Sequence, residues 1–258
     1  MEDKNSEDFM LFVKNKYGLD LSSKPGFAKN HLYSDIIRTR AGSYDNYMQS
    51  VKNNKSAENQ MLEKIVTNHT YFFRDDFHFT HTKNTLIPPI LKRYPGSAVN
   101  IWCCAASTGQ EAYSLAMTLD FAGIRFNITA SDLSQPALSE AKRGIYPISA
   151  IDEIPPLYHS YCRLNGNGFF EISEKLKSSI RFMVINLAGN FSMKNRFDAV
   201  YCRNVLMYFP NDIKKSVIEK AANTIKSGGF LYIGANENIS AFIPPSLEYI
   251  SSSIYRKR

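Results

Sequence analysis

The alternation of short apolar runs with longer amphipathic runs, which begins at about residue 98, constrains the fold more than any other feature of the chain. The short runs predict strands and lie at 98–105, 126–131, 180–185, 197–202 and 229–234. Segments with helical periodicity separate several of these runs. This order predicts an α/β fold with a mostly parallel, Rossmann-like sheet.

End signals support two of the predicted helices. Ser134 can cap a helix that has Pro136 in its first turn and ends at Gly144. Asn211 can cap a later helix, which Gly228 and Gly229 would end.

The chain divides into a helical part and a larger α/β part. Residues 1–93 carry apolar side chains at three- and four-residue spacings, which predicts a helical N-terminal subdomain and linker. Residues 94–258 form the second predicted domain, in which the turn-rich stretch 145–180 predicts a small β insertion. Residues 247–258 predict a last strand, and a short connection would make it antiparallel to its neighbour.

Composition excludes several classes of protein. The 258 residues are 44% hydrophobic and 21% charged, far from the composition of disordered chains. The four cysteines lack CxxC spacing, and His78 and His81 have no obvious carboxylate or thiol beside them, so neither a disulfide framework nor a metal site is expected. No segment approaches 18 consecutive apolar residues, and the N-terminus lacks the apolar core of a signal peptide. We therefore expect a cytoplasmic protein without membrane insertion.

The net charge of +7 is concentrated in the last third of the chain, where residues 175–258 hold 13 Lys and Arg against 5 Asp and Glu. Such an excess is typical of a protein with an acidic partner. Lysines on solvated helices account for it equally well, so the charge alone leaves both interpretations open.

The loops after the first two strands predict the ligand, because ligands of α/β sheets bind at the carboxyl ends of the strands. Asp132 ends the second strand, 23 residues beyond Gly109, where a carboxylate can accept hydrogen bonds from ribose hydroxyls. An Asx-turn after the strand is the alternative for Asp132. Glu111 opens the helix after the first strand and would repel a phosphate but suits a cation. Adenosine joined to a sulfonium fits both residues, which favours S-adenosylmethionine.

Five segments then identify a family: TNHTYFFRDDFHF (67–79), IWCCAASTGQEAYSLAMTL (101–119), ASDLSQPALSEAKRGIY (130–146), FDAVYCRNVLMYF (197–209) and SGGFLYIGANENI (227–239). In this order they resemble the signature blocks of the chemoreceptor glutamate methyltransferases, the CheR family. The resemblance implies a helical N-terminal domain and a class I methyltransferase domain with a small β insertion. It also implies methyl transfer from S-adenosylmethionine to receptor glutamates, which gives methyl esters and S-adenosylhomocysteine.

The resemblance also implies the residues of the site. Its cofactor-binding positions are Asn68, Thr70, Arg74, Glu111, Asp132, Asn186, Leu187, Arg203 and Asn204. Arg74 and Tyr208 match the two residues closest to the transferred methyl group and form the implied catalytic pair. The implied partners are the cytoplasmic helical domains of chemoreceptors and not nucleic acid, and we expect the protein to act as a monomer. Lys24, Arg38 and Arg40 are candidates for contact with that acidic surface.

Two features of the chain depart from the family pattern. Gln110 stands where the family commonly has an acid, and the β insertion is a few residues shorter than in members that dock a receptor C-terminal pentapeptide, so we expect no such tethering. We expect Phe72 and Phe73 to pack in the core. If Arg203 did not lie in the family-like segment 197–209, we would interpret it as a residue that forms a salt bridge at the end of a strand. A methyltransferase for RNA or a small molecule is an alternative function that suits the net charge. A non-catalytic module that binds S-adenosylmethionine or receptors is another.

Overall fold

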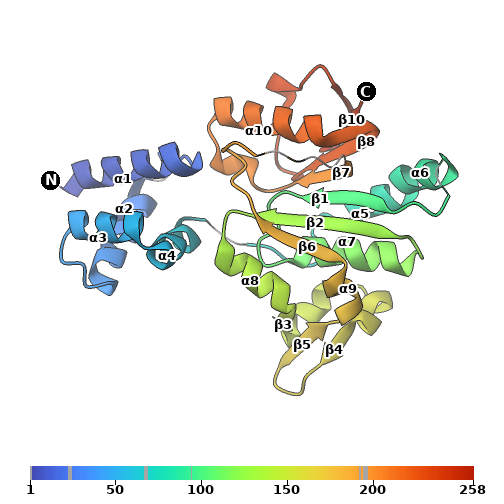
Figure 1. Ribbon diagram of the computed structural model, residues 1–258, viewed down its shortest axis with the longest axis horizontal. Coiled ribbons are helices and arrows are strands. Elements are labelled where there is room, and N and C mark those ends of the chain that lie inside the picture. The colour runs from blue at the N-terminus through green and yellow to red at the C-terminus, as the bar shows by residue number, and fades with distance from the viewer. Residues whose placement is uncertain (1, 23–24, 67–68, 94, 192, 194–196) are drawn as a thin grey trace.

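The computed structural model describes residues 2–22, 25–66, 69–93, 95–191, 193 and 197–258. The N-terminal part contains the helices α1 Glu2–Tyr17, α2 Pro25–Arg38, α3 Tyr44–Asn53 and α4 Lys55–Ile65. Helix α5 Phe77–His81, the π-helical turn η1 Thr82–Leu86 and helix α6 Ile87–Arg93 then lead into the sheet. Figure 1 shows α1 to α4 beside the sheet, at one end of the molecule.

The main sheet is mixed. It contains β1 Val99–Cys103, β2 Phe126–Asp132, β6 Ile180–Val184, β7 Phe197–Cys202, β8 Ile225–Ile233, β9 Leu247–Ser251 and β10 Ile254–Lys257, in the order β6-β2-β1-β7-β8-β10-β9. The strands from β6 to β8 are parallel, and β10 runs antiparallel to both β8 and β9. The strands predicted from the apolar runs are confirmed. The predicted last strand is a hairpin, whose second strand lies antiparallel beside β8.

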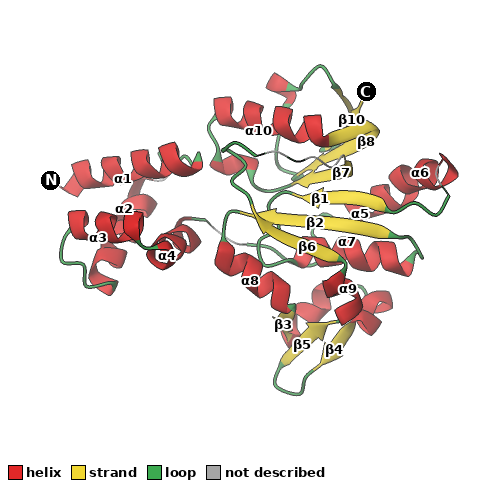
Figure 2. Cartoon of the chain, in the orientation of Figure 1, coloured by secondary structure: helices red, strands yellow, loops and turns green. Residues whose placement is uncertain are grey.

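Alternate side chains of the central strands face two different cores, as the period of two in a strand requires. Ile101 and Cys103 of β1 belong to one buried cluster, which helix α7 Gln110–Phe121 covers. Trp102 of β1 belongs to the other cluster, which helix α10 Asn211–Thr224 and the N-terminal helices cover. Figure 2 shows the helices on both sides of the sheet. Both faces of the parallel strands are therefore buried.

The insertion between β2 and β6 forms a second, small sheet. It consists of α8 Gln135–Arg143, β3 Ile145–Pro147, η2 Ile148–Glu153, η3 Pro156–Tyr161, β4 Cys162–Leu164, β5 Phe169–Ile172 and α9 Glu174–Ser178. Its strands are antiparallel in the order β3-β5-β4, which confirms the predicted β insertion. Phe72 packs against Tyr146 and Phe170, and Phe73 stacks on Tyr158, so both aromatics pack into the core as expected.

One of the two predicted helix-end patterns is confirmed, and the other is wrong. The hydroxyl of Ser134 accepts the N–H of Ala137 at 3.1 Å, and Gly144 ends α8. Helix α10 has no side-chain cap at its start, because Pro210 precedes it and Asn211 is already helical. It ends at Thr224, before the glycines, because the residues that follow pair with β7 and form β8. The free energy of pairing with a central strand outweighs the local glycine signal.

The N-terminal helices meet the sheet at the loop after α1. Gly18 has a φ of +77°, and a Cβ there would lie 2.3 Å from the Cβ of Ala188, so this contact requires glycine. The N–H of Asp20 donates to the carbonyl of Tyr208 at 2.8 Å. The end of α1 therefore lies against the loops that follow β6 and β7.

Candidate active site

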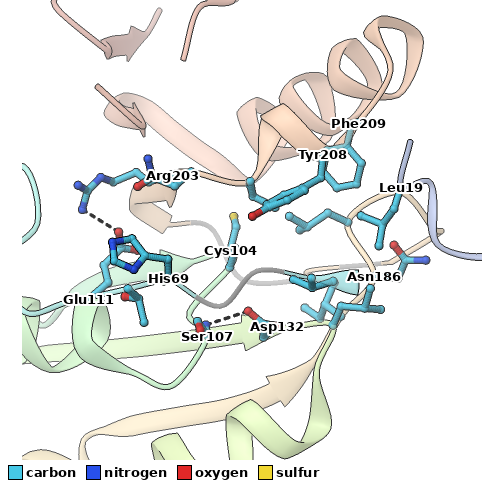
Figure 3. A pocket seen from close by; sticks show the side chains of 18 of the residues that line it. Leu19, His69, Cys104, Ser107, Glu111, Asp132, Asn186, Arg203, Tyr208 and Phe209 are labelled. Atoms are coloured by element: carbon cyan, nitrogen blue, oxygen red, sulfur yellow. Dashed lines mark hydrogen bonds and ion pairs between the residues drawn. The ribbon is translucent and has the colours of Figure 1, made fainter. Parts of the chain in front are cut away.

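A cavity lies at the carboxyl ends of the central strands, where the sheet meets the N-terminal helices (Figure 3). The space that its lining residues enclose, open solvent included, is about 870 Å³. Its wall combines the loops after β1, β2, β6 and β7 with the end of α1 and residues 69–74. Such a convergence is expected at the switch point of an α/β sheet.

The backbone of two loops holds the carboxylate of Asp132. One oxygen accepts the N–H of Ser107 at 2.8 Å, and the other accepts the N–H of Ser134 at 2.9 Å. The second bond makes the Asx-turn that was the alternative for Asp132, yet the same carboxylate also lines the cavity. A carboxylate offers about four lone-pair positions, so acceptor capacity remains toward the cavity. Burial raises the pKa of Asp132, and the backbone N–H groups act in the opposite direction.

The end of the cavity near α7 is built around a buried ion-pair network. The guanidinium of Arg203, whose side chain is 1% exposed, donates to Glu111 at 2.8 Å and to Asp75 at 2.7 Å. It also donates to the carbonyl of Arg74 at 2.6 Å. Burial raises the pKa of Glu111 despite the nearby Arg203, whereas Arg203 lowers the pKa of Asp75 although burial opposes this. Arg203 therefore connects α7 to the segment that carries Arg74.

Arg74 lies at the rim of the cavity, with part of its side chain exposed. Its Nη1 donates to the carbonyl of His69 at 3.0 Å, and its guanidinium lies over the ring of Tyr71, 5.5 Å from the ring centroid. A guanidinium has five N–H donors in a fixed plane. Arg74 can therefore hold a substrate carboxylate and keep these contacts.

The loop after β7 brings Asn204 and Tyr208 to the cavity. Asn204 adopts a φ of +56°, an uncommon conformation for a residue other than glycine. Leu206–Tyr208 form a 3₁₀ turn, η4. The N–H groups of Asn204 and Leu206 donate to the carboxylate of Glu237, at 2.8 and 2.7 Å. Figure 3 shows the side chain of Tyr208 on the side of the cavity opposite Asp132.

The loop after β6 completes the wall. Asn186 and Leu187 line the cavity, and the side-chain amide of Asn186 donates to the carbonyl of Lys16 at 3.2 Å. Lys220 of α10 donates to the carbonyls of Leu187 and Gly189, at 2.6 and 2.9 Å. Helix α10 thereby fixes the path of this loop.

The structure brings together every predicted site residue that it describes. Thr70, Arg74, Glu111, Asp132, Asn186, Leu187, Arg203, Asn204 and Tyr208 all line the one cavity. Asn68 lies outside the described residues. The roles of these residues in binding and catalysis stay predictions.

Where the loop after β1 meets α7, Gly109 and Gln110 make local contacts and do not line the cavity. Gly109 has a φ of +98°, and a Cβ there would lie 2.9 Å from the Cβ of Ala141 in α8, so its glycine serves the contact between loop and helix. The side chain of Gln110 accepts the hydroxyl of Thr108 at 2.8 Å. Neither Gly109 nor Gln110 is among the residues that line the cavity.

Sequence reasoning missed the residues that join one loop to another. Asp75 pairs with Arg203, which is 128 residues away, and Glu237 bonds Asn204, which is 33 residues away. No spacing rule predicts such pairs. The one signal in the sequence was that Asp75 and Glu237 fall inside the family-like blocks 67–79 and 227–239.

The donors and acceptors of the wall fit a nucleoside with a cationic group. Ser107 Oγ and Arg203 Nε are buried without a hydrogen-bond partner among the described residues, and a ligand would supply one. Asp132 offers acceptors for ribose hydroxyls, and Glu111 offers a carboxylate for a cation. No three His, Cys, Asp or Glu side chains gather to hold a metal ion in the part of the chain that the structure describes. The strand order of the sheet and the lining of this cavity fit a class I S-adenosylmethionine-dependent methyltransferase.

Comparison with known proteins identifies the family. The family model described as CheR methyltransferase, SAM binding domain, matches residues 68–255, so the chain belongs to the CheR methyltransferase family. A probable chemotaxis protein methyltransferase of Rhizobium etli is 32% identical over 87% of this chain and 83% of its own. A chemotaxis protein methyltransferase of Borreliella burgdorferi is 30% identical over 95% and 91%. Chemotaxis protein methyltransferase 1 of Pseudomonas aeruginosa is 29% identical over 98% and 97%.

Among solved structures, the N-methyltransferase NodS of Bradyrhizobium japonicum in complex with S-adenosyl-L-homocysteine is 15% identical over 60% of each chain, with a TM-score of 0.36. Family membership over nearly the whole chain confirms the predicted activity. The chain is an S-adenosylmethionine-dependent glutamate methyltransferase with chemotaxis receptors as its substrates.

Proposed function

We propose that this chain methylates glutamates on the cytoplasmic helical region of chemotaxis receptors, with Arg74 and Tyr208 as its catalytic pair. The observation that carries the proposal is that one cavity is lined both by the buried carboxylate of Asp132 and by the partly exposed guanidinium of Arg74. A nucleoside cofactor and a substrate carboxylate can therefore meet in this cavity. When bound, S-adenosylmethionine supplies a methyl group on a positively charged sulfur.

In this proposal, different residues of the cavity wall contact different parts of the cofactor. Asp132 accepts the ribose hydroxyls, and Asn186 and Leu187 flank the adenine. Glu111 faces the cationic end, and Arg203 holds Glu111 in place through the bond of 2.8 Å. Thr70 and Asn204 complete the polar contacts of that end.

The reaction needs no proton transfer. A glutamate side chain with a pKa of about 4.3 is already ionised at neutral pH. The chain therefore has to align the reacting atoms and keep water away from the carboxylate. Orienting groups in the wall serve this purpose, and a general base is not required.

Arg74 and Tyr208 provide the alignment. Arg74 holds one oxygen of the substrate carboxylate and leaves the other free to attack, while the ring of Tyr71 and the carbonyl of His69 restrict the guanidinium. The hydroxyl of Tyr208 donates a hydrogen bond that positions the same group or the carboxylate of the cofactor.

The expected substrate, the cytoplasmic region of a receptor, also bears on where the protein acts. Within the described residues, no helix has both the length and the apolar character needed to cross a bilayer. The proposal includes a cytoplasmic location and a monomeric state. Of the basic residues considered for receptor contact, Arg38 pairs with Asp35 and Gln60, and Lys24 lies outside the described residues.

The proposal is tested with radiolabelled S-adenosylmethionine and receptor cytoplasmic domains, by measuring volatile methanol after mild base. We expect base-labile label from the wild type, a loss of about 100-fold in turnover for Arg74→Ala and about tenfold for Tyr208→Phe. Calorimetric titration with S-adenosylhomocysteine should show that both variants still bind. Arg143→Ala on α8 and Tyr249→Phe on β9, both exposed, are the matched controls.

The outcomes separate the proposal from its alternatives. Base-stable label on RNA or on a small molecule would assign another methyltransferase activity. Binding of S-adenosylhomocysteine with no transfer to any receptor would assign the non-catalytic module. Unchanged turnover in both site variants would remove Arg74 and Tyr208 from the mechanism.

A further inference from the structure

The carboxylate of Glu237 is the meeting point of two loops at the carboxyl end of the sheet. Its Oε2 accepts the N–H of Asn204 and the N–H of Gly234, each at 2.8 Å. Its Oε1 accepts the N–H of Leu206 at 2.7 Å. Glu237 follows β8, whereas Asn204 and Leu206 follow the neighbouring strand β7. One side chain therefore organises the backbone of both loops.

The segment that Glu237 holds carries a large part of the active site. Arg203, Asn204 and Tyr208 all line the cavity. Glu237 does not line it, and its contacts are with backbone groups of this segment. Its carboxylate can therefore act on the reaction only through the residues that it positions.

The bonds to Glu237 satisfy specific needs of this segment. Leu206 begins the 3₁₀ turn that contains Tyr208, and the first N–H groups of such a turn have no partner inside it. Glu237 accepts one of them and so caps the turn. It also fixes Asn204, whose φ of +56° is uncommon outside glycine.

The neighbouring backbone shows how closely the two loops interlock. A Cβ at Gly234 would lie 2.6 Å from Nδ2 of Asn204 and 2.8 Å from Oε2 of Glu237. Gly234 therefore permits an approach that the carboxylate then stabilises with three N–H donors. An ionised carboxylate offers acceptors on both oxygens, whereas a glutamine amide offers one oxygen and presents N–H₂ to at least one of these donors.

We propose that Glu237 is a positioning residue of the methyl-transfer reaction, which holds the loop after β7 so that Tyr208 and Asn204 face the cavity. This inference rests on the proposed role of Tyr208. It gives a residue of the loop after β8 a role in catalysis, although that residue contacts neither cofactor nor substrate.

The test is a double-mutant cycle of Glu237→Gln and Tyr208→Phe, with kcat measured at saturating cofactor and receptor domain. Rates are expressed per molecule that binds S-adenosylhomocysteine, so that unfolded protein does not contribute. We expect Glu237→Gln to lower kcat about tenfold or more in the wild-type background, and by less than about threefold when Tyr208 is already phenylalanine. A residue that only stabilises the fold would not lower kcat per binding-competent molecule.

Matched variants complete the experiment. Glu248→Gln removes a carboxylate that pairs with Arg256 on the outer hairpin, and its kcat should stay within about twofold of the wild type. Glu237→Asp keeps the charge but shortens the side chain, and it replaces Glu237→Gln in the cycle if the glutamine variant does not fold. Wild-type kcat in the Glu237 variant, or an equal loss in both backgrounds, would overturn the inference. Wild-type kcat in Tyr208→Phe alone would instead overturn the proposed function.

Discussion

The negative charges of two carboxylates in the cavity wall, Glu111 and Asp132, are balanced in different ways. Glu111 has a side chain that is 14% exposed and faces the guanidinium of Arg203, so a charge balances a charge. Asp132 is 7% exposed and faces two backbone N–H groups, so dipoles balance the charge. Removing one partner of a buried ion pair leaves an unpaired charge, whereas removing the Asp132 carboxylate leaves only neutral backbone N–H groups without an acceptor, which costs less. We therefore expect the Glu111 end to control folding and the Asp132 end to control ligand binding.

Removing the cation from the Glu111 end should give the largest effect. Arg203→Met leaves Glu111 and Asp75 without their counter-charge in a mostly buried place. We expect the free energy of unfolding to fall by about 3 kcal/mol or more, because breaking a buried pair is costly. Urea denaturation followed by circular dichroism measures this change.

Arg143→Met is the control for that experiment, because Arg143 is exposed on α8 and should change the free energy of unfolding by less than about 0.5 kcal/mol. If Arg203→Met were as stable as this control, the network would contribute nothing and the contrast between the two ends would disappear.

Changing the other carboxylate should affect binding more than folding. Asp132→Asn keeps the shape of the side chain but removes its charge and half of its acceptors. We expect the affinity for S-adenosylhomocysteine to fall by about 1–3 kcal/mol, as measured by calorimetric titration. Asp212→Asn, in the exposed first turn of α10, should leave the affinity unchanged. An Asp132 variant with wild-type affinity would contradict the assignment to the ribose.

The same variant should also change the pH dependence of binding. Because burial raises the pKa of Asp132, its carboxylate takes up a proton at a higher pH than an ordinary aspartate and then loses acceptor capacity. We expect wild-type affinity to fall as the pH is lowered from about 7 to 4.5, and this fall to be smaller in Asp132→Asn. For folding the sign is opposite: a raised pKa favours the native state at low pH, and that contribution is lost as the pH rises through the raised value.

The smallest effect is expected beside Glu111, at Gln110. Gln110→Glu adds an acid to the first turn of α7, which lacks a side-chain cap, and the helix dipole should favour it by about 0.3–1 kcal/mol. The adjacent Glu111 opposes part of this gain. Thermal denaturation should therefore show a small rise or no change, with turnover within about twofold of the wild type. A large loss of turnover would mean that position 110 takes part in binding despite its place outside the cavity wall.

Local patterns predicted the architecture well, because strands and helices depend on the periodicity of apolar residues. The central strands followed from that periodicity, helix α8 from its end signals, and the β insertion from its turn-rich stretch. Helix α10 did not, since its cap and its end depend on Pro210 and on pairing with β7. The Asx-turn of Asp132 shows a similar limit, because one carboxylate serves the turn and the cavity wall together.

The sequence by itself determined the family, the order of the elements and most of the residues that meet in the cavity, because these depend on side-chain type and on position along the chain. Only the tertiary structure decided which residues support them. Asp75 against Arg203, Lys220 against the loop after β6, and Glu237 against the loop after β7 are contacts between segments far apart in the chain. Such contacts require a hydrogen-bond donor and an acceptor within about 3 Å of each other, and only the folded backbone sets that distance.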